Sequence, residues 1–131
     1  MNIARLFRII ATISAVIAAA FGMGTYTHAD FTNIHMLFGL IVALLLLIIS
    51  VIAVFTSKLR ILGVIGIIYA LVLPIFGVQQ ALILAGDLHW LTETTHLAVG
   101  FGAVALIGVI GERLARSKRS VNEVSTASKA A

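Results

Sequence analysis

The chain has no cysteine, a single proline, a single tryptophan and few charged residues. The lack of cysteine excludes disulfide bonds, covalent haem attachment through a CxxCH motif and thiolate metal sites. Charged side chains make up 11% of the 131 residues, whereas about a quarter is usual in soluble domains. Hydrophobic residues make up 61%. This balance excludes an ordinary soluble enzyme, a disordered chain and a disulfide scaffold, and it indicates that lipid is the solvent.

Four long apolar runs contain most of the hydrophobic residues. Each run is rich in Leu, Ile, Val, Ala and Gly without alternation of period two, which is typical of a helix and not of a barrel strand. A bilayer core requires about 20 apolar residues per helix. The predicted spans are residues 9–24, 34–55, 61–85 and 95–111. Because the loops are short, we expect an all-α integral membrane domain over residues 1–116, an up-down four-helix bundle, and then a poorly ordered cytoplasmic tail over residues 117–131.

The basic residues predict how this bundle is oriented. All nine lie before the first span, between spans two and three, or after span four, and the other two loops contain acidic residues and no base. The positive-inside rule therefore places both termini in the cytoplasm and loops 25–33 and 86–94 outside the cell membrane. The excess of basic residues thus indicates topology and not nucleic-acid binding. The first run is also compatible with a secretory signal whose cleavage leaves three spans; we expect it to be retained, because a repeat in the chain requires a first hairpin.

This repeat is a pattern of histidine and glycine in the two outer loops. Each copy reads HxxxxxxH with a glycine four residues further on, and the copies are 61 residues apart. Each copy opens a helix that runs inwards after an acidic loop. We therefore expect two repeated hairpins related by a pseudo-two-fold axis along the membrane normal. The residues of the pattern are His28, His35 and Gly39 in the first copy and His89, His96 and Gly100 in the second.

His35 and His96 are the candidate ligands of a metal ion. Spans two and four run in the same direction, so the two histidines lie at matched depth near the outer edge of the hydrocarbon. Two imidazoles from parallel helices at one depth suit bis-histidine ligation of a haem iron between the helices. Gly39 and Gly100, one turn further in, leave room for the porphyrin. The alternative is a pair of interfacial histidines without a cofactor.

Four further residues are candidates for supporting such a site. His28 and His89 have three alternative roles, which are binding a second metal ion, donating to the haem propionates and capping helices. Gln79 and Gln80, near the outer end of span three, contact either the cofactor or a neighbouring helix. No Arg or Lys lies on the outer side to pair with propionates, so Gln79, Gln80, Tyr26, Trp90, the outer histidines or water would take that role.

Over residues 5–115 the chain resembles one half of a heme A synthase. His35 in IHMLFGLIVALLL and His96 in THLAVGFGAVAL are similar to the histidines at the outer ends of the second and fourth helices in that family. The run VQQALILAG is similar to the family's glutamine-and-glycine run before the fourth helix. The resemblance implies a haem b cofactor, and it implies that Glu93, in the turn before His96, is the candidate catalytic acid.

The chain departs from that family in three respects. It has one four-helix half where the enzyme has two, Thr32 stands where the family has an acidic residue before the first histidine, and the cysteine pair of some members is absent. Two outcomes stay open. Either two copies dimerise to rebuild the pair of halves, or the chain keeps haem b and has lost the oxidation of the haem methyl group.

The sequence therefore predicts a membrane haem-binding protein that serves either electron transfer or haem modification as an oxidoreductase. The expected partners are lipid, haem and either a second copy or a respiratory complex, and no nucleic acid. The alternative is a cofactor-free small subunit or assembly factor of a respiratory membrane complex. A transporter ranks third because no acidic residue lies at mid-membrane to couple protons, and a histidine-based metal carrier is the remaining alternative.

Overall fold

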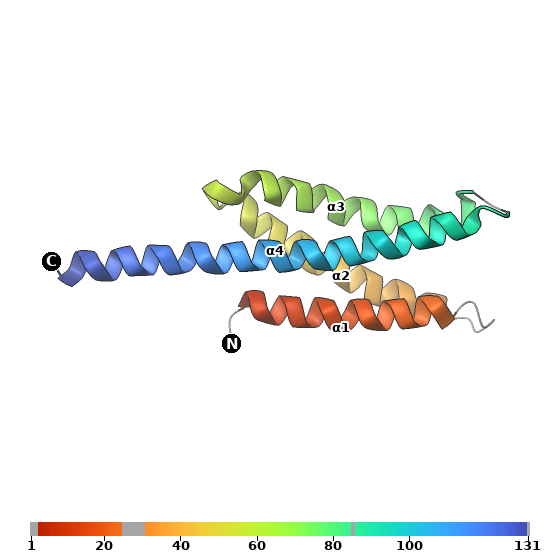
Figure 1. Cartoon of the computed structure of the whole chain (residues 1–131), viewed down its shortest axis with the longest axis horizontal. Coiled ribbons are helices and arrows are strands. Elements are labelled where there is room, and N and C mark those ends of the chain that lie inside the picture. The colour runs from red at the N-terminus through yellow and green to blue at the C-terminus, as the bar shows by residue number, and fades with distance from the viewer. Residues whose placement is uncertain (1–2, 25–30, 85, 131) are drawn as a thin grey trace.

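The computed structural model describes residues 3–24, 31–84 and 86–130. Successive helices run in alternating directions and pack side by side, with α4 projecting beyond the other three (Figure 1). Two short 3₁₀ turns, η2 (Ser57–Leu59) and η3 (Gln80–Leu82), lie at the two ends of α3. The long helices are α1 (Ile3–Gly24), α2 (Thr32–Val54), α3 (Arg60–Gln79) and α4 (His89–Ala130).

All four long helices are long and apolar enough to cross a membrane. The candidate spans are Arg5–Met23, Thr32–Val54, Ser57–Gln79 and His89–Ser117. Large apolar side chains on the outside of the bundle, such as Val16, Leu37 and Phe101, are more than half exposed. Such a surface is costly in water and suited to lipid. Over the described residues the structure thus confirms the predicted helical chain with four helices that could span a membrane.

The start of α1 and the end of α3 differ from the predicted ones. Helix α1 begins at Ile3, well before residue 9. Helix α3 ends at Gln79 and not at residue 85, because η3 follows it and the backbone then turns through Leu84 and Gly86, which have φ angles of 50° and 97°. Both angles lie in the left-handed region, which no helix of L residues continues through. The hydropathy of the sequence does not indicate this turn, because residues 81–85 are as apolar as the helix before them.

Helix α4 is longer than predicted in both directions. It begins at His89 instead of residue 95 and extends to Ala130 instead of residue 111. Residues 117–130, predicted to be a poorly ordered tail, are therefore part of this helix. The stretch contains no glycine or proline that would end it.

Helix α2, like α4, packs against each of the other three long helices. Small residues allow its closest contact, which is with α3. A Cβ atom added to Gly63 would lie 2.7 Å from the backbone oxygen of Ser50 and from the backbone nitrogen of Val54, and one added to Gly66 would overlap the Ser50 hydroxyl. We call the contact formed by Ser50, Gly63 and Gly66 the α2–α3 seam. Its close packing depends on the absence of side chains at the two glycines. The buried apolar core includes Val42, Ala43, Leu46, Ile49, Ala70, Leu73, Ala103, Ile107 and Ile110.

Candidate functional site

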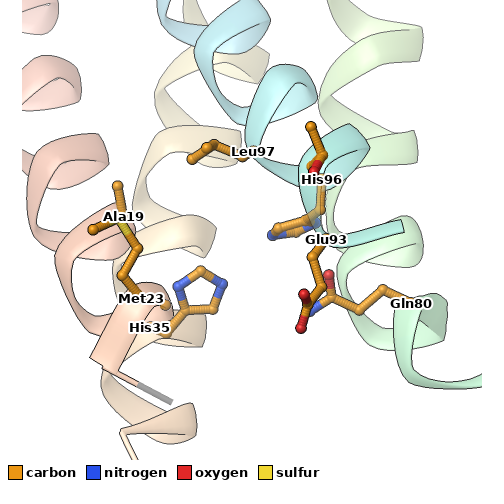
Figure 2. Close-up of a pocket in the computed structure, with 9 residues that line it drawn as sticks. Ala19, Met23, His35, Gln80, Glu93, His96 and Leu97 are labelled. Atoms are coloured by element: carbon orange, nitrogen blue, oxygen red, sulfur yellow. The ribbon is translucent and has the colours of Figure 1, made fainter. Parts of the chain in front are cut away.

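A cavity of about 190 Å³ lies at the end of the bundle where α1 meets α2 and η3 meets α4. Figure 2 shows its lining, in which polar side chains from α2, η3 and α4 face apolar side chains from α1 and α4. The cavity therefore joins segments that are far apart in the sequence. The lining residues are Ala19, Gly22, Met23, His35, Gln80, Glu93, Thr94, His96 and Leu97.

His35 and His96 approach each other across this cavity (Figure 2). Their ring centroids are 5.6 Å apart and the ring planes are inclined by 52°. One ring comes from the first turn of α2 and the other from the second turn of α4. The structure thus brings together the two histidines that the repeat predicts to lie at matched depth.

The ring of His35 is held by the backbone of α1. Its Nδ1 lies 2.7 Å from the carbonyl oxygen of Ala18. Because that oxygen only accepts, Nδ1 carries the proton and donates it, and the lone pair of the ring is on Nε2. The ring reaches this carbonyl because Gly22 has no side chain: a Cβ there would lie 3.0 Å from Nδ1 and 3.1 Å from Cε1 of His35.

The ring of His96 is held by α3, through ring contacts and not through a hydrogen bond. It stacks on Phe76, with centroids 5.8 Å apart and planes inclined by 29°. A Cβ added to Gly77 would lie 3.3 Å from Cε1 of His96. The Nδ1 atom of His96 is buried and has no hydrogen-bond partner among the described residues. Each histidine ring therefore lies close to a glycine of a neighbouring helix, but only the Nδ1 of His35 has a hydrogen-bond partner among the described residues.

Gly39 and Gly100 lie one turn further into the bundle than the histidines. Each belongs to the core-facing stripe of its helix, because Ala43 of α2 and Ala103 of α4, the next residues along these stripes, are buried. A Cβ added at either glycine nevertheless meets nothing within 4 Å. Open space therefore exists beside both helices just inward of the histidine pair.

Of the other candidate residues, Gln80 and Glu93 line the cavity and Gln79 does not. Gln80 lines the cavity, whereas Gln79 is exposed. Glu93 also lines the cavity, and its Oε1 lies 3.8 Å from Nε2 of His89 in the preceding turn of α4. The Nδ1 atom of His89 is buried and has no hydrogen-bond partner in the described part of the chain. His28 lies outside the described residues.

No group of three or more His, Cys, Asp or Glu side chains able to hold a metal ion occurs within residues 3–24, 31–84 and 86–130. The predicted second metal site at His28 and His89 therefore gains no support from the part of the chain that the structure describes. The pair of His35 and His96 is a two-donor site. Such a pair suits a metal ion that brings its remaining ligands with it.

Four residues that contact the histidines were not predicted from the sequence. They are Ala18, Gly22, Phe76 and Gly77. Gly22 and Gly77 perform matching roles in α1 and α3, but they stand at different distances before their histidines in the sequence. The histidine repeat consequently does not reveal them. The sequence contains a glycine in the last turn of each preceding helix, but that pattern alone does not point to a histidine.

Comparison with protein-family models, with curated proteins and with solved structures gives no match to this chain. The function is therefore argued from the chemistry and geometry of the site itself.

Proposed function

We propose that this chain is a membrane protein that binds haem b between α2 and α4, with His35 and His96 as the axial ligands. The observation that carries the proposal is the approach of the two rings across one cavity, with centroids 5.6 Å apart. Both rings line the same cavity and come from different helices, so His35 and His96 could bind one metal ion between them.

The donor set favours an iron porphyrin over a bare ion. A structural metal ion usually takes four protein ligands, and the described residues offer no group of three. A haem iron brings four porphyrin nitrogens and needs only two axial donors. The chain has no cysteine, so the haem would be held by ligation and packing alone.

The space around the histidines has to widen to hold a haem. The cavity of about 190 Å³ is smaller than the roughly 300 Å³ at the lower end of common ligand pockets. The open positions next to Gly39 and Gly100 add room on the inward side.

Each neighbouring residue has a specific part in this proposal. The Ala18 carbonyl keeps the proton of His35 on Nδ1 and so leaves Nε2 as the nitrogen that would bind the iron. Phe76 and Gly77 hold the ring of His96 in place. When bound, a bis-histidine haem supplies one-electron transfer. Glu93, on the wall of the same cavity, is the group that would hold or release a proton there if the haem itself is modified.

The proposal includes the placement of the chain in the cell membrane. The alternating directions of the four helices (Figure 1) and the position of all nine basic residues support two repeated hairpins with both termini in the cytoplasm. The histidine pair would then lie at the outer surface, where it can exchange electrons with a partner outside the cell membrane or with a lipid-soluble donor.

A titration with ferric haem b tests the proposal. The full chain, purified without haem in mild detergent, is expected to bind one haem with a low-spin spectrum. His35→Ala and His96→Ala are each expected to lose this spectrum, whereas Gln79→Ala, which removes an exposed amide outside the cavity, is expected to keep it. Circular dichroism monitors the helical fold of each variant. A folded wild-type chain that binds no haem would contradict the proposal and favour a cofactor-free subunit.

A further inference from the structure

We infer that the α1–α4 junction, defined by Arg8 of α1 and Gly108 of α4, binds the phosphate group of an anionic phospholipid through the Arg8 guanidinium. The junction lies near the start of α1, whereas the histidine cavity lies near the end of that helix. The two sites therefore belong to opposite ends of the bundle (Figure 1), and the inference is independent of the proposed haem.

Arg8 is positioned where α1 contacts α4. It precedes Ala11 by one helical turn, and Ala11 is fully buried, so Arg8 lies next to the inward-facing side of α1. Its Cδ atom lies 3.9 Å from the place of a Cβ atom added to Gly108, which is van der Waals contact. The aliphatic part of the side chain therefore packs against α4, while the residue as a whole stays exposed.

The depth of Arg8 suits a contact with lipid headgroups. The candidate span of α1, Arg5–Met23, has 19 residues, which corresponds to about 28 Å of helix and nearly the whole thickness of the hydrocarbon. The span begins three residues before Arg8, so the Cα atom of Arg8 lies about 5 Å inside the edge of the hydrocarbon. Helical side chains point towards the start of their helix, and an arginine is long enough to reach the headgroups from that depth.

The guanidinium of Arg8 lacks a protein anion in the described part of the chain. Arg8 takes part in no ion pair there, and the carboxylate of Glu112 in α4 is paired with Arg116. Exposed Arg5 and Arg113 add positive charge at the same end of the bundle. A charged side chain at the edge of the hydrocarbon requires a counter-charge, and here this charge comes from outside the chain.

The chemistry of this site selects a phosphate that belongs to a lipid. The planar guanidinium donates two parallel hydrogen bonds to the oxygens of a phosphate group. Basic sites between transmembrane helices typically bind the headgroups of anionic lipids. The excess of arginine at the junction favours a headgroup with a net negative charge, such as that of phosphatidylglycerol, over the zwitterionic headgroup of phosphatidylcholine.

Native mass spectrometry of the full chain in mild detergent tests the inference. With equal amounts of both lipids present, the wild-type chain is expected to retain phosphatidylglycerol in preference to phosphatidylcholine. Arg8→Gln is expected to weaken the binding of phosphatidylglycerol by about fivefold, which is typical of one basic residue at an anionic membrane surface. Arg8→Lys, which keeps the charge and loses the planar fork, is expected to bind with intermediate affinity.

Arg60→Gln is the matched control. It removes an exposed arginine at the same end of the bundle, at the start of α3, and it is expected to leave the affinity for phosphatidylglycerol nearly unchanged. Circular dichroism monitors the fold of each variant. Equal losses in Arg8→Gln and Arg60→Gln would indicate a general effect of charge and overturn the inference, as would a folded Arg8→Gln variant that binds like the wild type.

A second measurement requires no variant. Electron paramagnetic resonance of spin-labelled lipids, with the wild-type chain in phosphatidylcholine vesicles, is expected to show that labelled phosphatidylglycerol binds more weakly as the salt concentration rises, because salt screens exposed charges. Inorganic phosphate at the same ionic strength should displace it no better than chloride. Equal binding of labelled phosphatidylglycerol and phosphatidylcholine at low salt, or specific displacement by inorganic phosphate, would overturn the assignment to a lipid.

Discussion

Gly22 determines the position of His35 by having no side chain. In Gly22→Ala the new Cβ would lie 3.0 Å from Nδ1 of His35, so the ring must shift and its bond to the Ala18 carbonyl weakens. We expect haem affinity to fall by about 10- to 100-fold, measured by titration with ferric haem b. The helix itself tolerates the change, because alanine is favoured over glycine in helices by about 1 kcal/mol.

Gly77→Ala is the matched control for this prediction. Its new Cβ would lie 3.3 Å from Cε1 of His96, an atom that takes part in no hydrogen bond. The affinity should therefore fall less than in Gly22→Ala. Equal affinities in Gly22→Ala and the wild type would show that the Ala18 carbonyl does not support the ligand.

Substitutions at Gly39 and Gly100 test whether a bound haem occupies the space beside these two residues. A Cβ added at either position meets no protein atom within 4 Å, so the backbone accepts a side chain there and we expect Gly39→Leu and Gly100→Leu to keep the helical fold, measured by circular dichroism. If haem occupies this space, both variants should lose haem binding. Normal haem binding by both folded variants would place the macrocycle elsewhere.

At the scale of helices, the α2–α3 seam is the part of the bundle most sensitive to added volume. In Gly63→Ala the new Cβ would lie 2.7 Å from backbone atoms of Ser50 and Val54, so the two helices must separate. We expect the variant to be destabilised by about 1–3 kcal/mol, measured as a lower unfolding temperature in detergent.

The control for the seam is Gly108→Ala. Its Cβ would make an ordinary contact, 3.9 Å from Cδ of Arg8, and the substitution should be neutral or slightly stabilising. If Gly63→Ala and Gly108→Ala unfold at the same temperature, close packing at the seam is not a significant source of stability.

The sequence predicts the helices better than their ends, for a physical reason. The hydropathy of a segment is summed over its residues, and it predicts both ends of α2 to within two residues. The end of α3 depends on the backbone at Leu84 and Gly86, which apolar composition does not indicate. Helix α4 starts at His89, directly before the polar run WLTETT, which hydropathy does not assign to a span.

The candidate site is likewise predictable only in part. The repeat predicts that His35 and His96 lie at one depth, and the structure places their ring centroids 5.6 Å apart. The contacts of Ala18, Gly22 and Phe76 depend on how each helix is rotated about its own axis. Helices that are apolar on nearly every side carry little sequence information about that rotation, so these supporting residues emerge only from the structure.

At the scale of the whole molecule, the proposed topology can be tested because the chain has no cysteine. A single cysteine introduced at an exposed residue is then the only thiol. Asp87→Cys, between η3 and α4, should react in intact cells with a maleimide that cannot cross membranes. Ser57→Cys, in η2 at the opposite end of the bundle, should react only after the cells are permeabilised. The reverse pattern would invert the orientation and place the histidines on the cytoplasmic side.

The most direct measurement of the central claim is a reduced-minus-oxidised absorption spectrum of the full chain purified from membranes. The wild-type chain is expected to show the sharp bands of a low-spin b-type haem. His35→Ala and His96→Ala should each lose them while remaining folded. A folded, colourless wild-type chain, or b-type bands that persist when both histidines are replaced together, would contradict the account.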